Sequence, residues 1–145
     1  MALIGERDLG RSGITVPALG VGTNRWGSRP STQTALNEVF AAAIDAGVGS
    51  FDTAEIYTGG KSERAIGQAA KEDGRPAFIA SKFAPFPHRL TAGQFSRALD
   101  RSLARLGRDW IDLYYVHFPF SPVGLSPWIR AMAEAVGSGR IRAVG

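Results

Sequence analysis

The sequence predicts an α/β protein built on a parallel sheet, and three observations support this prediction. Short apolar runs of strand type alternate with amphipathic stretches of helical type. The alternation repeats about every 30 residues, which is the size of a βαβ unit. Glycine or proline separates most of the expected elements from the next. Two architectures fit this pattern, a doubly wound open sheet and a (β/α)8 barrel.

The composition is that of a globular protein with one core. The chain has 145 residues, of which 44% are hydrophobic and 21% are charged, and this length suits one ordinary domain. No apolar run approaches the roughly 20 residues that span a bilayer, and residues 1–8 lack the pattern of a signal peptide. The absence of cysteine excludes disulfides and thiolate metal sites. We therefore expect a single domain over residues 1–145 with no second domain, no membrane partner, no metal and a cytoplasmic location.

A net charge of +4 and a pI near 10 raise the question of nucleic-acid binding. Four arginines recur at helical spacing opposite four apolar residues: Arg97, Arg101, Arg105 and Arg108 against Phe95, Leu99, Leu103 and Leu106. This pattern is typical of the solvated face of an amphipathic helix. No aromatic residues interleave with these arginines, and no zinc or recognition-helix motif accompanies them. We expect no nucleic-acid partner.

The N-terminal third is expected to hold a hairpin, a strand and a helix. Residues 6–17 contain a glycine-bracketed turn and suggest a small β-hairpin. Residues 18–22 follow as the first core strand, which ends at Thr23 and Asn24. A helix begins after Pro30-Ser31 and is closed by Gly47. Its expected buried face is Leu36, Val39, Phe40, Ala43 and Ile44.

The middle of the chain is expected to hold two more strands around a helix. The second strand covers residues 48–52. A helix covers about residues 62–71, with Ser62 as its N-cap and Glu63 in its first turn. The third strand, residues 77–82, comes after Gly74 and Pro76.

The last third repeats the alternation. A capping box formed by Thr91 and Gln94 begins the arginine-bearing helix, and Gly107 ends it. The fourth strand covers residues 110–117. Ser126 is expected to be the N-cap of the next helix, with Pro127 at the first helical position. Its expected buried side is Ile129, Met132, Ala133 and Val136, and a fifth strand begins at residue 141.

Two common nucleotide-binding motifs do not fit this chain. The first strand lacks a Gly-x-Gly-x-x-Gly turn, and no acidic residue stands where the dinucleotide fingerprint requires one. Gly60-Lys61-Ser62 resembles part of a P-loop, but Glu55 occupies the position of the first required glycine. We interpret this segment as the beginning of a helix.

Three strand ends carry ionisable residues that can form one site. Asp52, Lys82 and His117 each end a predicted strand, and Tyr57 follows Asp52 by five residues. Because strand residues alternate faces, counting back from each gives interior sets that mix small and large side chains, as barrel layers require. The sets are Asp52, Ser50 and Val48; Lys82, Ala80 and Phe78; and His117, Tyr115 and Leu113. We expect the four side chains to meet at the carboxyl ends of the strands.

These residue types suit proton donation to a carbonyl oxygen. An ammonium beside a phenol favours the phenolate, so it makes the phenol a better acid. A carboxylate keeps a buried ammonium charged, and a histidine can orient a polarised oxygen or relay a proton. Each residue alone is more often structural, as a cap, a core histidine or a solvent-facing lysine. Four of them on successive strand ends favour a site.

The motifs resemble those of the aldo-keto reductases. The resemblance rests on residues 51–57 (Phe-Asp-Thr-Ala-Glu-Ile-Tyr) with Gly60, Ser62 and Glu63 after them, and on residues 19–23, 80–82 and 112–117. It covers the whole chain. It implies a partial (β/α)8 TIM barrel, with parallel strands one to five and an N-terminal β-hairpin that closes the bottom.

The resemblance also implies roles for individual residues. Asp52, Tyr57, Lys82 and His117 would be the catalytic tetrad, with Tyr57 as the general acid. Gly22, Thr23, Asn24 and Asp52 match positions that lie against the nicotinamide half of NADPH. The implied activity is NADP(H)-dependent hydride transfer that reduces small aldehydes or ketones to alcohols.

The chain departs from the family pattern because it stops in strand five, whereas a barrel takes about 250 residues. The residues that would determine whether NADP or NAD is preferred lie beyond Gly145. Two alternatives therefore stay open: a non-catalytic, cofactor-sensing regulatory subunit of the same fold, and an inactive truncated fragment. We expect residues 1–145 alone to self-associate through open sheet edges.

Overall fold

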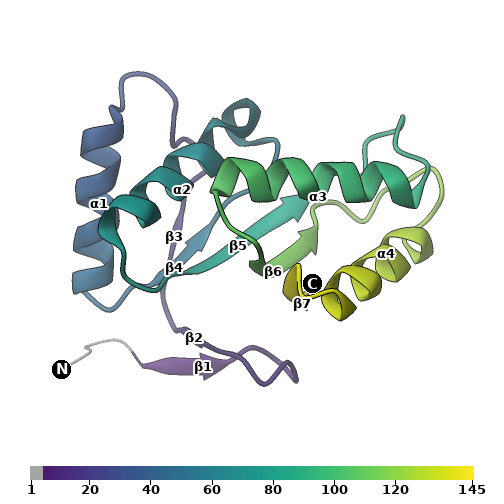
Figure 1. Cartoon of the computed structure of the whole chain (residues 1–145), viewed down its shortest axis with the longest axis horizontal. Helices are drawn as coiled ribbons and strands as arrows, with labels where there is room; N and C mark the ends of the chain where they lie inside the picture. The colour runs from purple at the N-terminus through teal and green to yellow at the C-terminus, as the bar shows by residue number, and fades with distance from the viewer. Residues whose placement is uncertain (1–4) are drawn as a thin grey trace.

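The computed structural model describes residues 5–145 and has the alternating order that the sequence predicts (Figure 1). A hairpin precedes five further strands, which alternate with four α-helices and one 3-10 turn. The elements are β1 Glu6–Asp8, β2 Thr15–Pro17, β3 Gly20–Gly22, α1 Gln33–Asp45, β4 Ser50–Asp52, the 3-10 turn Tyr57–Gly60, α2 Lys61–Asp73, β5 Phe78–Phe83, α3 Ala92–Leu106, β6 Ile111–Val116, α4 Ser126–Gly137 and β7 Ile141–Val144.

The five strands form one parallel sheet in the order β3-β4-β5-β6-β7, which is their order along the chain. A doubly wound sheet would reverse direction at a switch point, and no reversal occurs among these strands. The main core, between sheet and helices, contains residues of all four helices, so these helices cover one face of the sheet. This is the arrangement of half a (β/α)8 barrel, and the barrel prediction is confirmed over the open-sheet alternative.

The opposite face of the sheet is the barrel interior. Ala80, Leu113 and Ala143 form a small buried cluster there, and Leu9 and Ile14 of the β1–β2 hairpin pack against it. The hairpin strands pair antiparallel, as expected. Figure 1 shows the hairpin beside the ends at which the strands begin, away from the helices. The carboxyl ends of the strands are therefore the ends that the hairpin leaves uncovered.

The helix faces differ in part from those expected. In α1, Leu36 and Phe40 are buried, but Val39 is half exposed, because the helix packs on a narrower stripe than its apolar residues suggest. In α4, the expected buried side was largely wrong. Ile129, Ala133 and Val136 are exposed, and only Met132 is buried.

The buried stripe of α4 is rotated by one residue from the expected one. It consists of Trp128, Ala131, Met132 and Ala135. Trp128 is fully buried and its ring lies 5.0 Å from that of Phe83. A large aromatic side chain buries more apolar area than an isoleucine, so its anchoring against β5 decides which face turns inward.

Two predicted helix caps differ from the structure. Gly60, in the left-handed conformation, is the N-cap of α2 in place of Ser62, which lies inside the first turn. The N-cap of α4 is Leu125 in place of Ser126, which is the first residue of the helix and is followed by Pro127. The capping box of Thr91 and Gln94 at α3 is confirmed.

The arginine stripe of α3 is only partly solvated. Arg97 and Arg101 are exposed as expected. Arg105 pairs with fully buried Glu63 of α2 at 2.6 Å, and Arg108 pairs with buried Asp112 of β6 at 2.9 Å. The last turn of α3 and the residues just after it face these carboxylates, which a helical periodicity cannot reveal.

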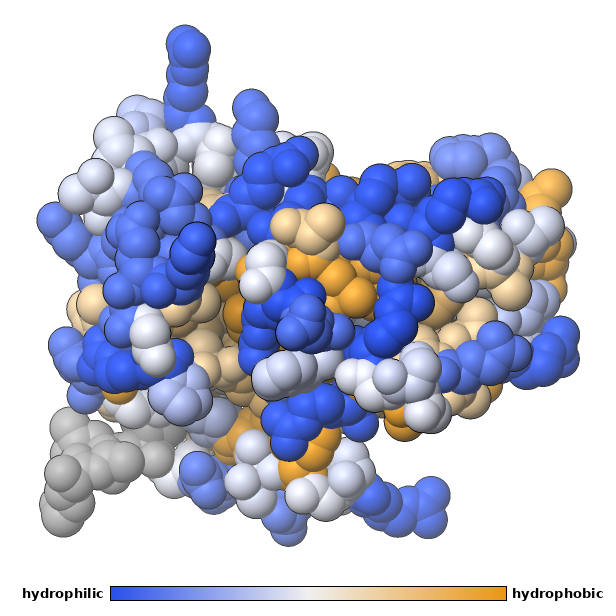
Figure 2. Space-filling model, viewed as in Figure 1, coloured by the Kyte–Doolittle hydropathy of each residue, from blue (hydrophilic) through white to orange (hydrophobic). Residues whose placement is uncertain are grey.

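The face of the molecule that carries α2 and α3 is mainly hydrophilic, with a small apolar patch near the middle of the view (Figure 2). None of the helices described here is long and apolar enough to cross a bilayer. Within residues 5–145, no three His, Asp or Glu side chains are grouped so that they could bind a metal ion.

Candidate active site

The carboxyl ends of β4, β5 and β6 bring three of the predicted residues together. Pairing of Asp52 with Ala80 and of Lys82 with Tyr115 places the strand ends side by side. The Lys82 ammonium donates hydrogen bonds to Asp52 Oδ2 at 2.6 Å and to the Thr53 carbonyl oxygen at 2.9 Å. The Lys82 side chain is only 14% exposed. A mostly buried ammonium is thus held by an adjacent carboxylate, which keeps it charged.

Tyr57 lies over the same ammonium. It begins the 3-10 turn that links β4 to α2. Lys82 Nζ donates a third hydrogen bond to Tyr57 Oη at 3.2 Å and lies 4.8 Å from the centre of the tyrosine ring. A lysine ammonium has three N–H donors, and these three acceptors use all of them. Asp52, Tyr57 and Lys82 therefore form one connected group.

The turn that carries Tyr57 has a constrained backbone. Thr58 has φ of +49°, and Gly59 and Gly60 also have positive φ. A β-branched residue rarely adopts this conformation. The Thr58 hydroxyl donates a hydrogen bond to the Trp26 carbonyl oxygen at 2.8 Å, which ties the turn to the segment after β3. The turn is thus fixed to the chain that follows β3.

His117 follows β6 and faces Tyr57 edge-on. The two ring centres lie 5.6 Å apart with an angle of 82° between the planes, and Phe118 stacks on the imidazole at 4.3 Å. Burial lowers the pKa of His117, and the positive charge of Lys82 lowers it further, although Asp52 and Glu55 act in the opposite direction. The imidazole is therefore neutral at neutral pH. Its Nδ1 atom is buried and has no hydrogen-bond partner among the described residues.

A buried cluster of hydroxyl groups lies behind Asp52. Thr23, Thr53 and Ser62 are all fully buried. Thr23 Oγ1 donates to the Asp52 carbonyl oxygen at 2.8 Å, and Ser62 Oγ donates to the Thr23 carbonyl oxygen at 2.7 Å. Thr53 Oγ1 lies 2.8 Å from Ser62 Oγ. The cluster joins the ends of β3 and β4 to the first turn of α2. Ser62, which the sequence suggested as a helix cap, is part of this cluster instead.

The residues predicted to contact a nicotinamide ring differ in exposure. Gly22 and Asn24 are exposed at the end of β3, and a Cβ added at Gly22 would meet no atom within 4 Å. The Asp52 side chain is 45% exposed. Thr23 is buried, with its hydroxyl and backbone N–H both donating to the Asp52 carbonyl oxygen. Gly22, Asn24 and Asp52 are therefore accessible to a ligand, whereas the hydroxyl and the backbone N–H of Thr23 are already engaged.

Sequence reasoning missed two buried carboxylates near the site. Glu63 is fully buried, where it accepts from Ser81 Oγ at 2.6 Å and from Arg105. The Glu55 side chain is 6% exposed and pairs with Arg89. Glu55 stands directly between two site residues in sequence, but its partner is 34 residues away, so no local pattern indicates the pair.

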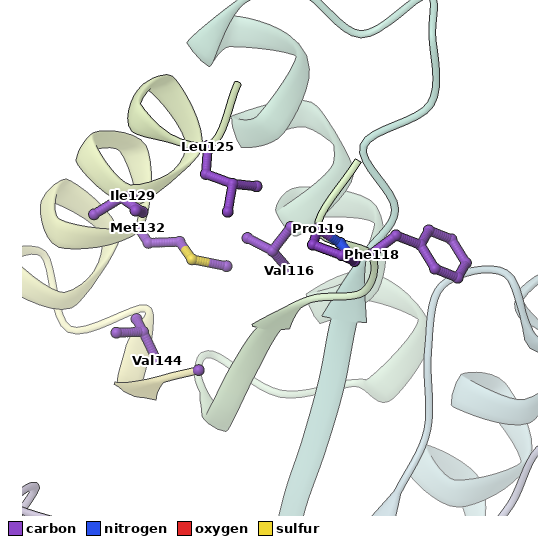
Figure 3. Close-up of a pocket in the computed structure, with 8 residues that line it drawn as sticks. Val116, Phe118, Pro119, Leu125, Ile129, Met132 and Val144 are labelled. Atoms are coloured by element: carbon purple, nitrogen blue, oxygen red, sulfur yellow. The ribbon is translucent and has the colours of Figure 1, made fainter. Parts of the chain in front are cut away.

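An apolar pocket of about 480 Å³ lies outside this group (Figure 3). Figure 3 shows Leu125, Ile129 and Met132 on one side of it, with Val116 and Val144 from β6 and β7 facing them. Its lining holds no ionisable side chain. The side chains that line the pocket offer no group for proton transfer.

The arrangement at the strand ends can donate a proton. A lysine has no hydrogen-bond acceptor, so Lys82 cannot use the Tyr57 hydroxyl hydrogen, which can point to an acceptor outside the group. Negative charge that develops on Tyr57 Oη after proton loss lies 3.2 Å from a fixed ammonium. Such preorganised charge is the usual means of stabilising a proton transfer.

Several known proteins have sequences similar to this one. The model of the Aldo/keto reductase family matches residues 18–145. The chain is 35% identical over 144 residues to the NADP(+) aldo-keto reductase yakc of Schizosaccharomyces pombe, covering 90% of this chain and 42% of that protein. It is 34% identical over 148 residues to the aldo-keto reductase YhdN of Bacillus subtilis, covering 92% of this chain and 44% of that protein. The chain thus spans somewhat under half the length of these curated relatives.

Solved structures share the fold. A thermostable aldo-keto reductase in complex with the inhibitor epalrestat matches with a TM-score of 0.84 and 38% identity, over 98% of this chain and 53% of that one. An aldo-keto reductase from Klebsiella pneumoniae in complex with NADPH matches with a TM-score of 0.72 and 32% identity, over 90% of this chain and 45% of that one. The likeness covers the described sheet and its helices.

Proposed function

We propose, since the chain belongs to the aldo/keto reductase family, that it supplies the proton-donating half of an NADPH-dependent oxidoreductase that reduces small aldehydes or ketones to alcohols. The observation that carries the proposal is the group formed by one ammonium, one carboxylate and one phenol: Lys82 hydrogen-bonds both Asp52 and Tyr57. Relatives named as reductases share this half of the chain.

In the proposed reaction, Tyr57 is the general acid. Its hydroxyl donates a proton to the carbonyl oxygen of the substrate as that oxygen gains negative charge. Lys82 stabilises the charge left on Tyr57 Oη, and Asp52 holds the ammonium in place and charged. Bound NADPH would supply the hydride. The neutral imidazole of His117, beside the phenol ring, would orient the carbonyl oxygen by donating a hydrogen bond.

Residues at the end of β3 are proposed to hold the cofactor. Gly22 leaves room for the nicotinamide ring, and the exposed amide of Asn24 and the carboxylate of Asp52 are suitable partners for its carboxamide. Thr23 would contribute indirectly, since its hydroxyl fixes the Asp52 backbone from behind. The structure of the Klebsiella pneumoniae relative with NADPH supports the choice of cofactor.

A turnover assay tests the proposal against the regulatory alternative. The complete barrel that carries this chain is incubated with NADPH and a panel of aldehydes and ketones, and the loss of NADPH absorbance is followed. Multiple turnovers with alcohol formation are expected. Tight NADPH binding without turnover on any member of the panel would contradict the proposal and favour a cofactor-sensing subunit.

A further inference from the structure

We propose that Glu55 and Arg89 are a positioning pair that keeps Tyr57 against Lys82. This inference rests on the proposed function, because it concerns how the general acid is held. Neither residue contacts the phenol. Glu55 precedes Tyr57 by two residues, and Arg89 lies in the segment between β5 and α3, which follows Lys82.

The pair is buried and bidentate. The side chains of Glu55 and Arg89 are 6% and 10% exposed. Arg89 Nη1 donates to Glu55 Oε1, and Arg89 Nη2 donates to Glu55 Oε2 at 3.0 Å. Both carboxylate oxygens are thus engaged by one guanidinium. Bidentate pairing of this kind fixes the relative orientation of the two side chains.

The pair also binds both backbone polar groups of one residue next to the site. The Ala84 N–H donates to Glu55 Oε1 at 2.6 Å, and Arg89 Nη1 donates to the Ala84 carbonyl oxygen at 2.7 Å. Ala84 is two residues beyond Lys82 and has no exposed surface. The ion pair therefore fixes the chain immediately after the catalytic lysine to the chain immediately before the catalytic tyrosine.

Aromatic rings hold the guanidinium in place. It lies 4.9 Å from the ring centre of Phe83 and 5.2 Å from that of Phe86. Phe83 is fully buried in the main core. Arg89 is thus held by the core, and Glu55 is held by Arg89.

The backbone continues this attachment toward Tyr57. The Thr53 N–H donates to the Ala80 carbonyl oxygen at 2.9 Å, and the Glu55 N–H lies 3.4 Å from the Lys82 carbonyl oxygen. The second contact is long, so the Glu55 side chain provides the stronger link at this point. If it is lost, the segment from Glu55 to Tyr57 can move away from β5, and the 3.2 Å contact between Tyr57 Oη and Lys82 Nζ is released.

A double-mutant cycle on kcat tests the inference in the complete barrel that carries this chain. Glu55→Gln keeps the shape of the side chain and removes its charge. With Tyr57 present, kcat should fall about 10- to 100-fold, because misplacement by about 1 Å can cost 10²-fold. In a Tyr57→Phe background the same change should alter the residual rate less than about twofold, since the pair acts through the phenol.

A second buried carboxylate provides the matched control. Asp112 also accepts a backbone N–H, from Ile79 at 2.9 Å, and also pairs with arginine, at the far end of β6. Asp112→Asn should lower the free energy of unfolding and leave the kcat of the folded protein unchanged. Equal losses of kcat in Glu55→Gln and Asp112→Asn would overturn the positioning role.

Further outcomes separate this inference from the proposed function. If Glu55→Gln fails to fold, Arg89→Lys is placed in the same cycle, because it keeps the charge and loses the bidentate contact. The inference, but not the proposed function, would be overturned if the effects of Glu55→Gln and Tyr57→Phe on kcat were additive. An unchanged kcat in Glu55→Gln would have the same consequence. Full activity in Tyr57→Phe would instead overturn the proposed function.

Discussion

Lys82 shows how much of the proposed chemistry depends on one side chain. Its three N–H donors meet a carboxylate, a backbone carbonyl and a phenol. Asp52 is about half exposed, so its pairing with Lys82 adds less stability than the roughly 3–5 kcal/mol lost when a fully buried pair is broken. The main effect of the contact between Asp52 and Lys82 is therefore to place the ammonium beside Tyr57.

The first prediction concerns the titration of His117. Burial and the charge of Lys82 lower its pKa, so we expect an imidazole pKa below the ordinary value of about 6.5. The folded state then binds fewer protons than the unfolded state just below that pH. The free energy of unfolding should fall as the pH drops through this window and level off below the folded pKa.

The measurement is a pH titration of the imidazole protons by NMR, with His117→Gln to assign the signal. The same variant should lose this part of the pH dependence of unfolding. A His117 pKa at or above 6.5 would show that the imidazole is not held as described.

The residues of the site differ in how far the sequence could predict them. Asp52, Lys82 and His117 end strands, and parallel strands bring their carboxyl ends to one edge, so their meeting follows from topology. The burial of Thr23 and the pairing of Glu55 with Arg89 depend on contacts between segments far apart in the chain. Such contacts leave no periodic signal, so the sequence could not reveal that the hydroxyl of Thr23 is already engaged by the backbone of Asp52.

At the scale of elements, α2 and α3 pack so closely that a glycine is required between them. A Cβ added at Gly67 of α2 would lie 2.4 Å from the Leu106 carbonyl oxygen and 2.8 Å from the Leu106 Cα. Both are backbone atoms, which cannot rotate away. The close approach also brings Arg105 of α3 against Glu63 of α2.

We therefore predict that Gly67→Ala destabilises the fold. Overpacking usually costs about 1–3 kcal/mol, which should exceed the gain of up to about 1 kcal/mol from the better helix propensity of alanine. Gly137 of α4 is the matched control, because a Cβ there would meet no atom within 4 Å. Urea unfolding should show a loss for Gly67→Ala and no loss for Gly137→Ala, and equal stability of the two variants would contradict the packing described here.

The elements also show where periodicity succeeds and where it does not. Strand and helix order, the capping box of α3 and the final glycine of α3 are local features, and the sequence predicted them. The buried face of α4 depends on which side chain finds a partner in the sheet. Trp128 packs against Phe83, and a pattern of apolar residues at positions 129, 132, 133 and 136 cannot indicate that partner.

At the scale of the whole molecule, the sheet has two edges. Within residues 5–145, β3 pairs only with β4, and β7 pairs only with β6. In the part of the chain that the structure describes, the hydrophobic residues packed against the interior cluster of Ala80, Leu113 and Ala143 are Leu9 and Ile14 of the hairpin and two aromatic residues of the sheet. An edge strand offers unpaired N–H and C=O groups to another chain.

We predict that a polypeptide limited to residues 1–145 self-associates in solution. Sedimentation should detect species heavier than a monomer, and their share should rise with protein concentration. The variant Val144→Lys, at an exposed position on β7, should reduce the association, because a charged edge resists pairing. A monodisperse monomer over the accessible concentration range would contradict this prediction.

The central claim is that Tyr57, activated by Lys82, donates the proton. Tyr57→Phe removes the donor hydroxyl and keeps the ring, so NADPH binding should be nearly unchanged. General acid catalysis contributes about 10²–10⁴-fold in rate, so the single-turnover rate of carbonyl reduction in the complete barrel should fall by that factor. A Tyr57→Phe variant that binds NADPH normally and reduces the carbonyl at half the wild-type rate or more would contradict the claim.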